Sequence, residues 1–275
     1  MDCSQMHDAD QKLVLISIAS DNIKYSLQKA EQLKSAFFIF FRFFMTLNTV
    51  TSNTRWHNFV SQDAINQAAV TRILAAANEA IIQHGSFFIV LAGGGTPKSV
   101  YQLLSKAPAE WANWHVYHND DRCLPVDHVE RNSKMARDVW LDRVAIPQNQ
   151  IHDIPTELGN IEGAKAYAKT LQGVGTFDLV ILGLGEDGHT ASLFPNKTVD
   201  NSADVVPVFD APKPPADRVT MSLNRLNNTH EVLFLVTGAG KQEAVNNWRK
   251  GVNIPATLIS PENGVDVYCF GVKLN

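Results

Sequence analysis

The apolar run Phe177–Leu182, which leads directly into a glycine-rich loop, constrains the fold of this chain more than any other segment. A short apolar run bounded by glycines is typical of a strand that is buried on both faces, as in a parallel sheet. The run Phe87–Ala92 has the same character and also ends in glycines. Such strands require long connections, because parallel strands cannot be joined by a tight turn.

Helical patterns occur where those connections are needed. Apolar residues recur at helical spacing from Asp63 to His84, and Gly85 is placed to end that helix in the left-handed conformation. Further helices are expected at residues 97–105, 131–143, 160–172 and 240–249, and further strands at Trp114–His118, Glu231–Thr237 and Val265–Phe270. This alternation predicts an α/β fold with a doubly wound, mostly parallel sheet flanked by helices, Rossmann-like in architecture.

The first 48 residues differ in character from the rest. We expect a poorly ordered extension at 1–48 and a single α/β domain at 49–275. The apolar run 36–45 contains Arg42 and is shorter than the roughly 20 residues that span a bilayer. Acidic residues near the start do not suit a secretory signal. The alternative interpretation is an amphipathic segment that binds a membrane or a partner.

Composition excludes several classes of protein. The net charge of −4 gives no basic surface for nucleic acid. Cys3, Cys123 and Cys269 are far apart and odd in number, which favours a reducing, cytoplasmic location over a disulfide framework. No histidines and cysteines stand at zinc-site spacing, so we expect no metal. The sequence does not indicate an oligomeric state.

The loop Gly183–Pro195 carries the side chains most suited to chemistry, among them Asp187 and His189. Ligands of open α/β sheets bind beyond the carboxyl ends of strands, and this loop follows a strand. Its glycines also fit the spacing of a dinucleotide-binding fingerprint. That interpretation is disfavoured, because the segment continues into Pro195 and a stretch at 196–217 rich in proline, aspartate and asparagine, with no second strand–helix unit.

A second glycine loop, residues 93–95, precedes Thr96 and Pro97, which suit the N-cap and first position of a helix. Amide groups at such a helix start favour a phosphate. Lys241 likewise follows a strand and begins a helix, where it can point back at a bound anion.

The Gly183–Pro195 loop closely resembles the most diagnostic segment of the 6-phosphogluconolactonases. The glycine turn with Thr96, the triplet Asp120–Arg122, the segment at Arg218 and Lys241 match further motifs of that family, in the same order. The chain departs from the pattern at Asp121, where the family has glutamate, and at Arg131, where it has serine. The resemblance implies the fold of the sugar-phosphate isomerases and hydrolysis of a sugar-phosphate lactone without a cofactor.

The resemblance also implies roles for individual residues. His189 would be the base, oriented by Asp120 or Asp187, with the amides of 183–188 as candidate oxyanion donors. Gly94, Gly95, Thr96, Lys241 and Arg218 would hold the phosphate, while Arg122 and Asn132 would face the rest of the sugar.

Two other functions stay open at this stage. Glucosamine-6-phosphate deaminases share the glycine loop, Asp120, the Asp187–His189 segment and Lys241, but they carry glutamate at the position of Phe194 and tyrosine at that of Arg122. A sugar-phosphate-binding protein without catalysis is the other alternative.

Residues 1–44 have no counterpart in the family, and we therefore expect them to be dispensable. A chain that begins at Met45 should fold and keep full activity, because the regular α/β pattern starts after that residue. Solubility and turnover of the shortened chain check this expectation. Loss of either would show that the segment is an integral part of the domain.

Overall fold

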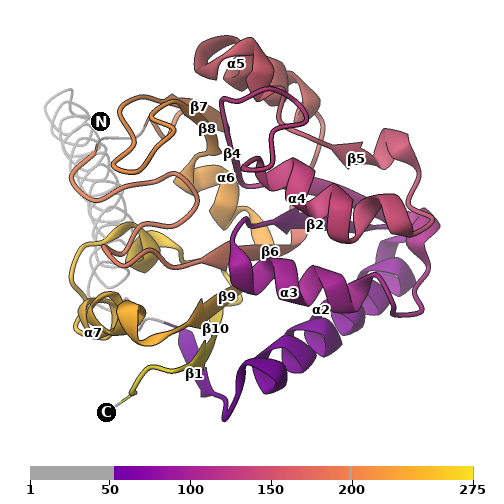
Figure 1. Ribbon diagram of the computed structural model, residues 1–275. Helices are drawn as coiled ribbons and strands as arrows, with labels where there is room; N and C mark the ends of the chain where they lie inside the picture. The colour runs from indigo at the N-terminus through magenta and orange to yellow at the C-terminus, as the bar shows by residue number, and fades with distance from the viewer. Residues whose placement is uncertain (1–52, 198–199, 275) are drawn as a thin grey trace, which may run out of the picture. The chain divides into compact units, whose positions relative to one another are not determined.

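A seven-stranded sheet forms the centre of the computed structural model, which describes residues 53–197 and 200–274 (Figure 1). The strand order is β1-β10-β9-β6-β2-β3-β5, and all neighbouring strands are parallel. The strands are β1 (Thr54–Asn58), β2 (Phe87–Leu91), β3 (Trp114–His118), β5 (Ile151–His152), β6 (Phe177–Gly183), β9 (Thr229–Thr237) and β10 (Val265–Phe270). The predicted doubly wound α/β fold is confirmed. Our expectations for residues 1–48 lie outside the described residues.

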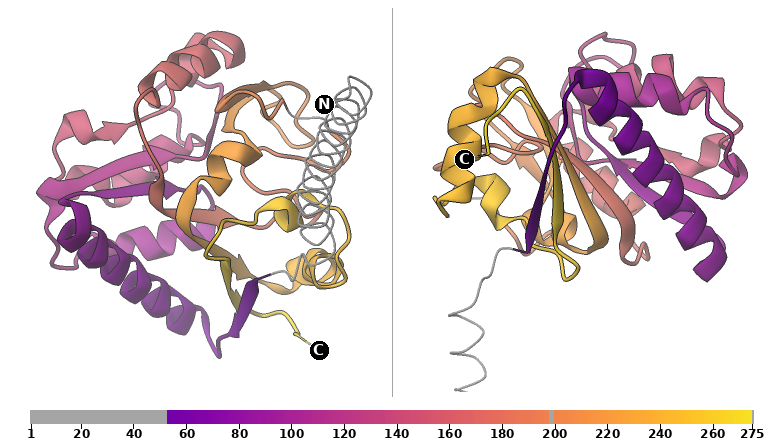
Figure 2. Two further views of the ribbon diagram at one scale, coloured as in Figure 1. Left: turned by 180° about the vertical axis from the view of Figure 1, so that it is seen from behind. Right: turned by 90° about the horizontal axis from the view of Figure 1, so that it is seen from below.

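Helices cover both faces of this sheet (Figure 2). One face packs against α2 (Gln62–His84), α3 (Gly95–Leu104) and α4 (Asn132–Val139). The other contributes to a core shared with α5 (Asn160–Thr170) and α7 (Gln242–Arg249). Successive residues of β6 alternate between these cores: Ile181 belongs to the first and Leu182 to the second. Both are fully buried, which explains why this strand is apolar throughout.

The starts of two helices show how the local sequence fixes their ends. The Ser61 hydroxyl accepts a hydrogen bond from Ala64 N at the start of α2, and Gly85 ends that helix with φ 86°, as predicted. The predicted start of α3 was wrong: Gly94 is the N-cap and the helix begins at Gly95. Gly94 has φ 105°, which only glycine adopts easily, so the chain turns two residues earlier than a Thr96 cap would require.

A second, smaller sheet was not predicted. It is antiparallel, with β4 (Asp120–Arg122), β8 (Arg218–Met221) and β7 (Val205–Val208) in that order. Strands of three or four residues that contain charges or proline give too short a pattern to recognise from sequence. The β4–β8 pairing places Arg122 opposite Arg218 and thereby joins two segments that are far apart in the sequence.

Asp121 ties β4 to the start of α4. Its side chain is fully buried and accepts hydrogen bonds from Asn132 N at 2.7 Å and Ser133 Oγ at 2.7 Å. It also pairs with the buried Arg131 guanidinium, whose Nε lies 3.2 Å from Oδ2. The two departures from the family pattern, Asp121 and Arg131, are thus in direct contact with each other.

Replacing Asp121 with alanine should cost about 3–5 kcal/mol of unfolding free energy, because it leaves the buried charge of Arg131 without this partner and removes the cap of α4. Urea unfolding measures the loss. Asp138→Ala is the matched control, since Asp138 forms an exposed pair with Lys134 and should contribute about 0.5 kcal/mol or less. Equal losses in the two variants would contradict a structural role for Asp121.

Candidate active site

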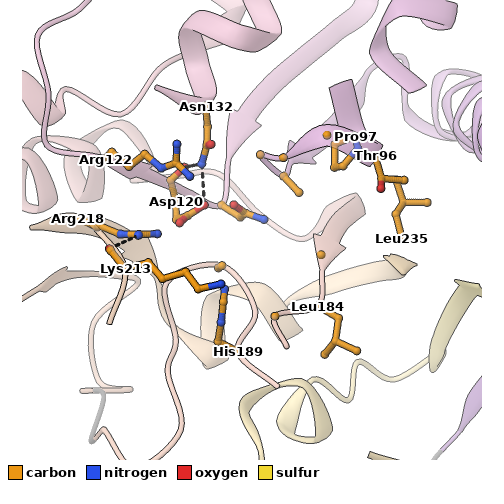
Figure 3. Close-up of a pocket in the computed structure, with 18 of the residues that line it drawn as sticks. Thr96, Pro97, Asp120, Arg122, Asn132, Leu184, His189, Lys213, Arg218 and Leu235 are labelled. Atoms are coloured by element: carbon orange, nitrogen blue, oxygen red, sulfur yellow. Dashed lines mark hydrogen bonds between the residues drawn. The ribbon is translucent and has the colours of Figure 1, made fainter. Parts of the chain in front are cut away.

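A pocket of about 390 Å³ opens at the carboxyl ends of β2, β3, β6 and β9. In the parallel sheet, β3 lies on the side of β2 that faces away from β6, whereas β9 and β10 lie on the side of β6 that faces away from β2. The boundary between β2 and β6 is therefore a topological switch point, where open α/β sheets bind their ligands. The small sheet and its loops close the remaining side of the pocket (Figure 3).

The site residues expected from the sequence come together in this pocket. Those that line it are Gly94, Gly95, Thr96, Asp120, Arg122, Asn132, His189, Arg218 and Lys241. Asp187 is not among the lining residues, but it contacts His189 from behind. Sequence reasoning assigned no role to Asn119, Phe194, Lys213 or Thr237, which also line it. Lys213 lies in the stretch 196–217 that is rich in proline, aspartate and asparagine, and a lone lysine there carries no distinguishing signal.

His189 and Asp187 form a close pair. His189 Nδ1 lies 2.5 Å from Asp187 Oδ1, and the same oxygen accepts a hydrogen bond from the His189 amide. Burial raises the pKa of Asp187, but the hydrogen bonds and charge of His189 outweigh it, so the pKa is lower than usual. An ionised carboxylate only accepts hydrogen bonds, so Nδ1 carries the proton of this contact and Nε2 is the ring nitrogen left for proton exchange with a ligand. Of the two carboxylates left open by the sequence, Asp187 is the one in contact with this ring.

Gly185 permits this pair to form. A Cβ at Gly185 would lie 2.0 Å from His189 Nδ1 and 2.6 Å from Asp187 Oδ1. The amide of Gly185 donates to the carbonyl of His189, and the amide of Gly188 donates to the carbonyl of Gly185. These two amides are therefore used within the loop. They are not available as oxyanion donors, whereas the expectation for the other amides of 183–188 stays a prediction.

Asp120 occupies a different position, where it does not contact the imidazole. Its carboxylate accepts hydrogen bonds from Ser192 Oγ at 2.5 Å and from Asn132 Nδ2 at 3.0 Å. Burial raises its pKa, although Ser192 and the charges of Arg218 and Arg122 act in the opposite direction. Asn132 packs so closely over Gly93 that a Cβ there would lie 1.9 Å from its Oδ1.

Two arginines lie near Asp120: Arg122 is on the same strand, β4, and Arg218 is on the paired strand, β8. Arg122 Nη1 donates to the carbonyl of Glu130, while its Nε has no hydrogen-bond partner among the described residues. Arg218 is more fully engaged, because its Nη2 and Nε donate to the carbonyls of Lys213 and Pro215. Burial lowers the pKa of Arg218. Arg122 therefore has more capacity to bind a ligand than Arg218.

The start of α3 and Lys241 supply positive potential at another part of the wall. Lys241 ends the 3₁₀ turn Ala239–Lys241, and burial lowers its pKa. The Thr96 hydroxyl lies 2.6 Å from that of Thr237, at the end of β9. The residues described in the structure include no group of three or more His, Cys, Asp or Glu side chains arranged to hold a metal ion.

Comparison with known protein families shows which family this chain belongs to. The model of the family "Glucosamine-6-phosphate isomerases/6-phosphogluconolactonase" matches residues 60–268. The chain belongs to this family. It is 36% identical over 195 residues to the 6-phosphogluconolactonase of Synechocystis, covering 68% of this chain and 81% of that protein. It is also 36% identical over 203 residues to the 6-phosphogluconolactonase of Mycobacterium tuberculosis, covering 68% and 82%.

Solved structures of the family agree. The crystal structure of the 6-phosphogluconolactonase from Thermotoga maritima matches with a TM-score of 0.75 and 27% identity, covering 79% of this chain and 99% of that one. The α/β architecture is therefore a shared feature of the family fold.

Gly185→Ala should displace the His189 ring, because the added methyl group would lie within contact distance of Nδ1. Gly183→Ala is the matched control, since a Cβ there meets nothing within 4 Å. Nitrogen NMR of the imidazole checks both variants: the Nδ1–H signal of His189 should shift or vanish in the first and persist in the second. Unchanged spectra in both would show that the loop adapts without moving the ring.

Proposed function

We propose that the protein hydrolyses 6-phosphogluconolactone to 6-phosphogluconate, a step of the pentose phosphate pathway. Curated relatives that are 36% identical to it are named for this activity. The observation that carries the proposal is the His189–Asp187 pair, which leaves an imidazole nitrogen free to act as a base in a polar pocket.

Hydrolysis of a lactone requires a base for water and an acid for the ring oxygen that leaves. His189 Nε2 takes a proton from water as the water oxygen bonds to the lactone carbonyl carbon. The tetrahedral intermediate then collapses, the bond from that carbon to the ring oxygen breaks, and the imidazolium returns the proton to the leaving oxygen. Asp187 keeps the ring in the required tautomer and stabilises its charged form.

The sugar is oriented by groups around Asp120. The Asp120 carboxylate is held by Ser192 and Asn132, and we assign it to a hydroxyl group of the substrate. Arg122, which lines the pocket, is assigned to the end of the sugar that becomes the carboxylate, because one of its nitrogens donates to a backbone carbonyl whereas two of those of Arg218 do. Arg218 is assigned to holding the neighbouring loop and the charge of Asp120, rather than to the phosphate as the sequence suggested.

The phosphate is assigned to the start of α3 and to Lys241. The amides at Gly95 and Thr96 lie at the positive end of the helix dipole and line the pocket. The Lys241 ammonium adds a full charge in a partly buried setting, where charge-assisted hydrogen bonds are strong. A lactone without the phosphate would not make these contacts.

The deaminase alternative fits less well. Ring opening and isomerisation need a proton relay supported by a carboxylate. The position where the deaminases carry glutamate holds Phe194, whose ring centroid lies 4.9 Å from that of His189. Phenylalanine stabilises the imidazole by packing but transfers no proton.

The cellular location proposed is the cytoplasm. Cys123 and Cys269 are free thiols, consistent with a reducing compartment. Among residues 53–197 and 200–274, no helix has the length and hydropathy to cross a membrane.

Replacing His189 with alanine should lower kcat by about 10²–10⁴-fold, the usual contribution of a positioned acid–base group. Asp187→Asn should also lower kcat, because an amide donor facing Nδ1 stabilises the wrong tautomer. His230→Ala, at an exposed position on β9, is the control and should hydrolyse freshly prepared lactone like the unmodified protein. Near-normal turnover of a folded His189→Ala variant would eliminate the proposed base.

A further inference from the structure

The loop 209–217 connects β7 to β8 and carries Lys213 into the pocket wall (Figure 3). Its backbone is fixed from both sides: Lys197 Nζ donates to the carbonyls of Phe209 and Asp210, and Arg218 donates to the carbonyls of Lys213 and Pro215. The Lys213 side chain itself is 67% exposed. A backbone held by these hydrogen bonds therefore presents an exposed lysine side chain to the pocket.

The nearest acidic partner of Lys213 is a weak one. Its Nζ lies 3.9 Å from Glu186 Oε2, at the limit of an ion pair, and Glu186 is 62% exposed. The same carboxylate lies against Gly240, where a Cβ would be 3.3 Å from Glu186 Oε1, and the next residue is Lys241. Glu186 therefore borders both lysines that line the pocket.

The positive charges of Lys213 and Lys241 repel each other electrostatically. After burial, the charges that most influence the pKa of Lys241 are Glu186, which raises it, and Lys213, which lowers it. Two cations thus flank one pocket, and the exposed carboxylate of Glu186 lies near both. An anion with a double charge would offset their mutual repulsion better than this carboxylate, and a phosphate monoester carries close to two charges at neutral pH.

We propose that Lys213 is a second cation for the substrate phosphate, and that it exchanges its loose pairing with Glu186 for the phosphate when substrate binds. This inference rests on the function proposed above. Exposed pairs at this distance contribute little, so the exchange has a small cost. Because the phosphate takes no part in the chemical step, its contact with Lys213 is the same in ground and transition states and should affect KM rather than kcat.

Lys213→Met tests the proposal, because it removes the charge and keeps most of the stem. The KM for 6-phosphogluconolactone should rise about tenfold with kcat within about twofold, and kcat/KM for unphosphorylated gluconolactone should not change. Lys213→Arg should restore KM to within about threefold. Glu186→Gln should lower KM, and this effect should be smaller in the Lys213→Met background.

The pair Lys165–Glu162 supplies the matched control, since its side chains are 65% and 62% exposed and do not line the pocket. Lys165→Met and Glu162→Gln should leave KM unchanged. The proposal is overturned if Lys213→Met leaves KM unchanged, lowers kcat instead, or affects both lactones equally. The last result would indicate a role in loop structure alone.

Calorimetric binding of 6-phosphogluconate separates this proposal from the proposed function. If the unmodified protein binds 6-phosphogluconate without hydrolysing the lactone, the proposed function fails, and a tenfold weaker Kd in Lys213→Met still supports the role of Lys213. Equal Kd values in the two proteins overturn that role whatever the turnover. Absence of both lactone hydrolysis and 6-phosphogluconate binding in the unmodified protein overturns both.

Discussion

The hydrogen bond between Asp187 and His189 determines what the pocket can do, and it depends on the absence of a side chain at Gly185. The two residues are separated by Gly188 alone, so their side chains meet only because the loop folds back over Gly185. The ionised carboxylate then fixes the proton on Nδ1 and leaves Nε2 available. A base made in this way needs no long-range partner. The loop follows β6, in which residues 177–182 are buried, and this strand supports it.

The remaining groups reach this base through the arrangement of the two sheets. The parallel sheet places the loops after β2, β6 and β9 at one edge, which brings the start of α3 and Lys241 to the pocket. The small antiparallel sheet brings Asp120, Arg122 and Arg218 from the other side. Asp121 connects the small sheet to the parallel-sheet layer, because in the protein interior it accepts a hydrogen bond from the start of α4 and forms an ion pair with Arg131. Adjacent carboxylates in the sequence therefore have separate tasks: Asp120 lines the pocket and Asp121 supports it.

Long apolar and periodic segments could be predicted from the sequence, whereas short elements and individual contacts could not. The strand at 87–92 and the helix at 63–84 correspond closely to β2 and α2, because burial on both faces or on one face leaves a pattern over many residues. Strands such as β4 and β8 depend on pairing with each other and leave no such pattern. The motifs located the pocket residues, but choosing between Asp120 and Asp187 required a distance. The position of Lys213 depends on hydrogen bonds to loop carbonyls, which sequence does not reveal.

The decisive measurement is the initial rate of acid release from freshly prepared 6-phosphogluconolactone, corrected for spontaneous hydrolysis. With the unmodified protein we expect a rate well above the spontaneous one, and no ammonia released from glucosamine-6-phosphate under the same conditions. Release of ammonia would assign the chain to the other activity of its family. Tight binding of 6-phosphogluconate with no acceleration of hydrolysis would contradict the proposed hydrolysis and indicate a binding protein that keeps the fold.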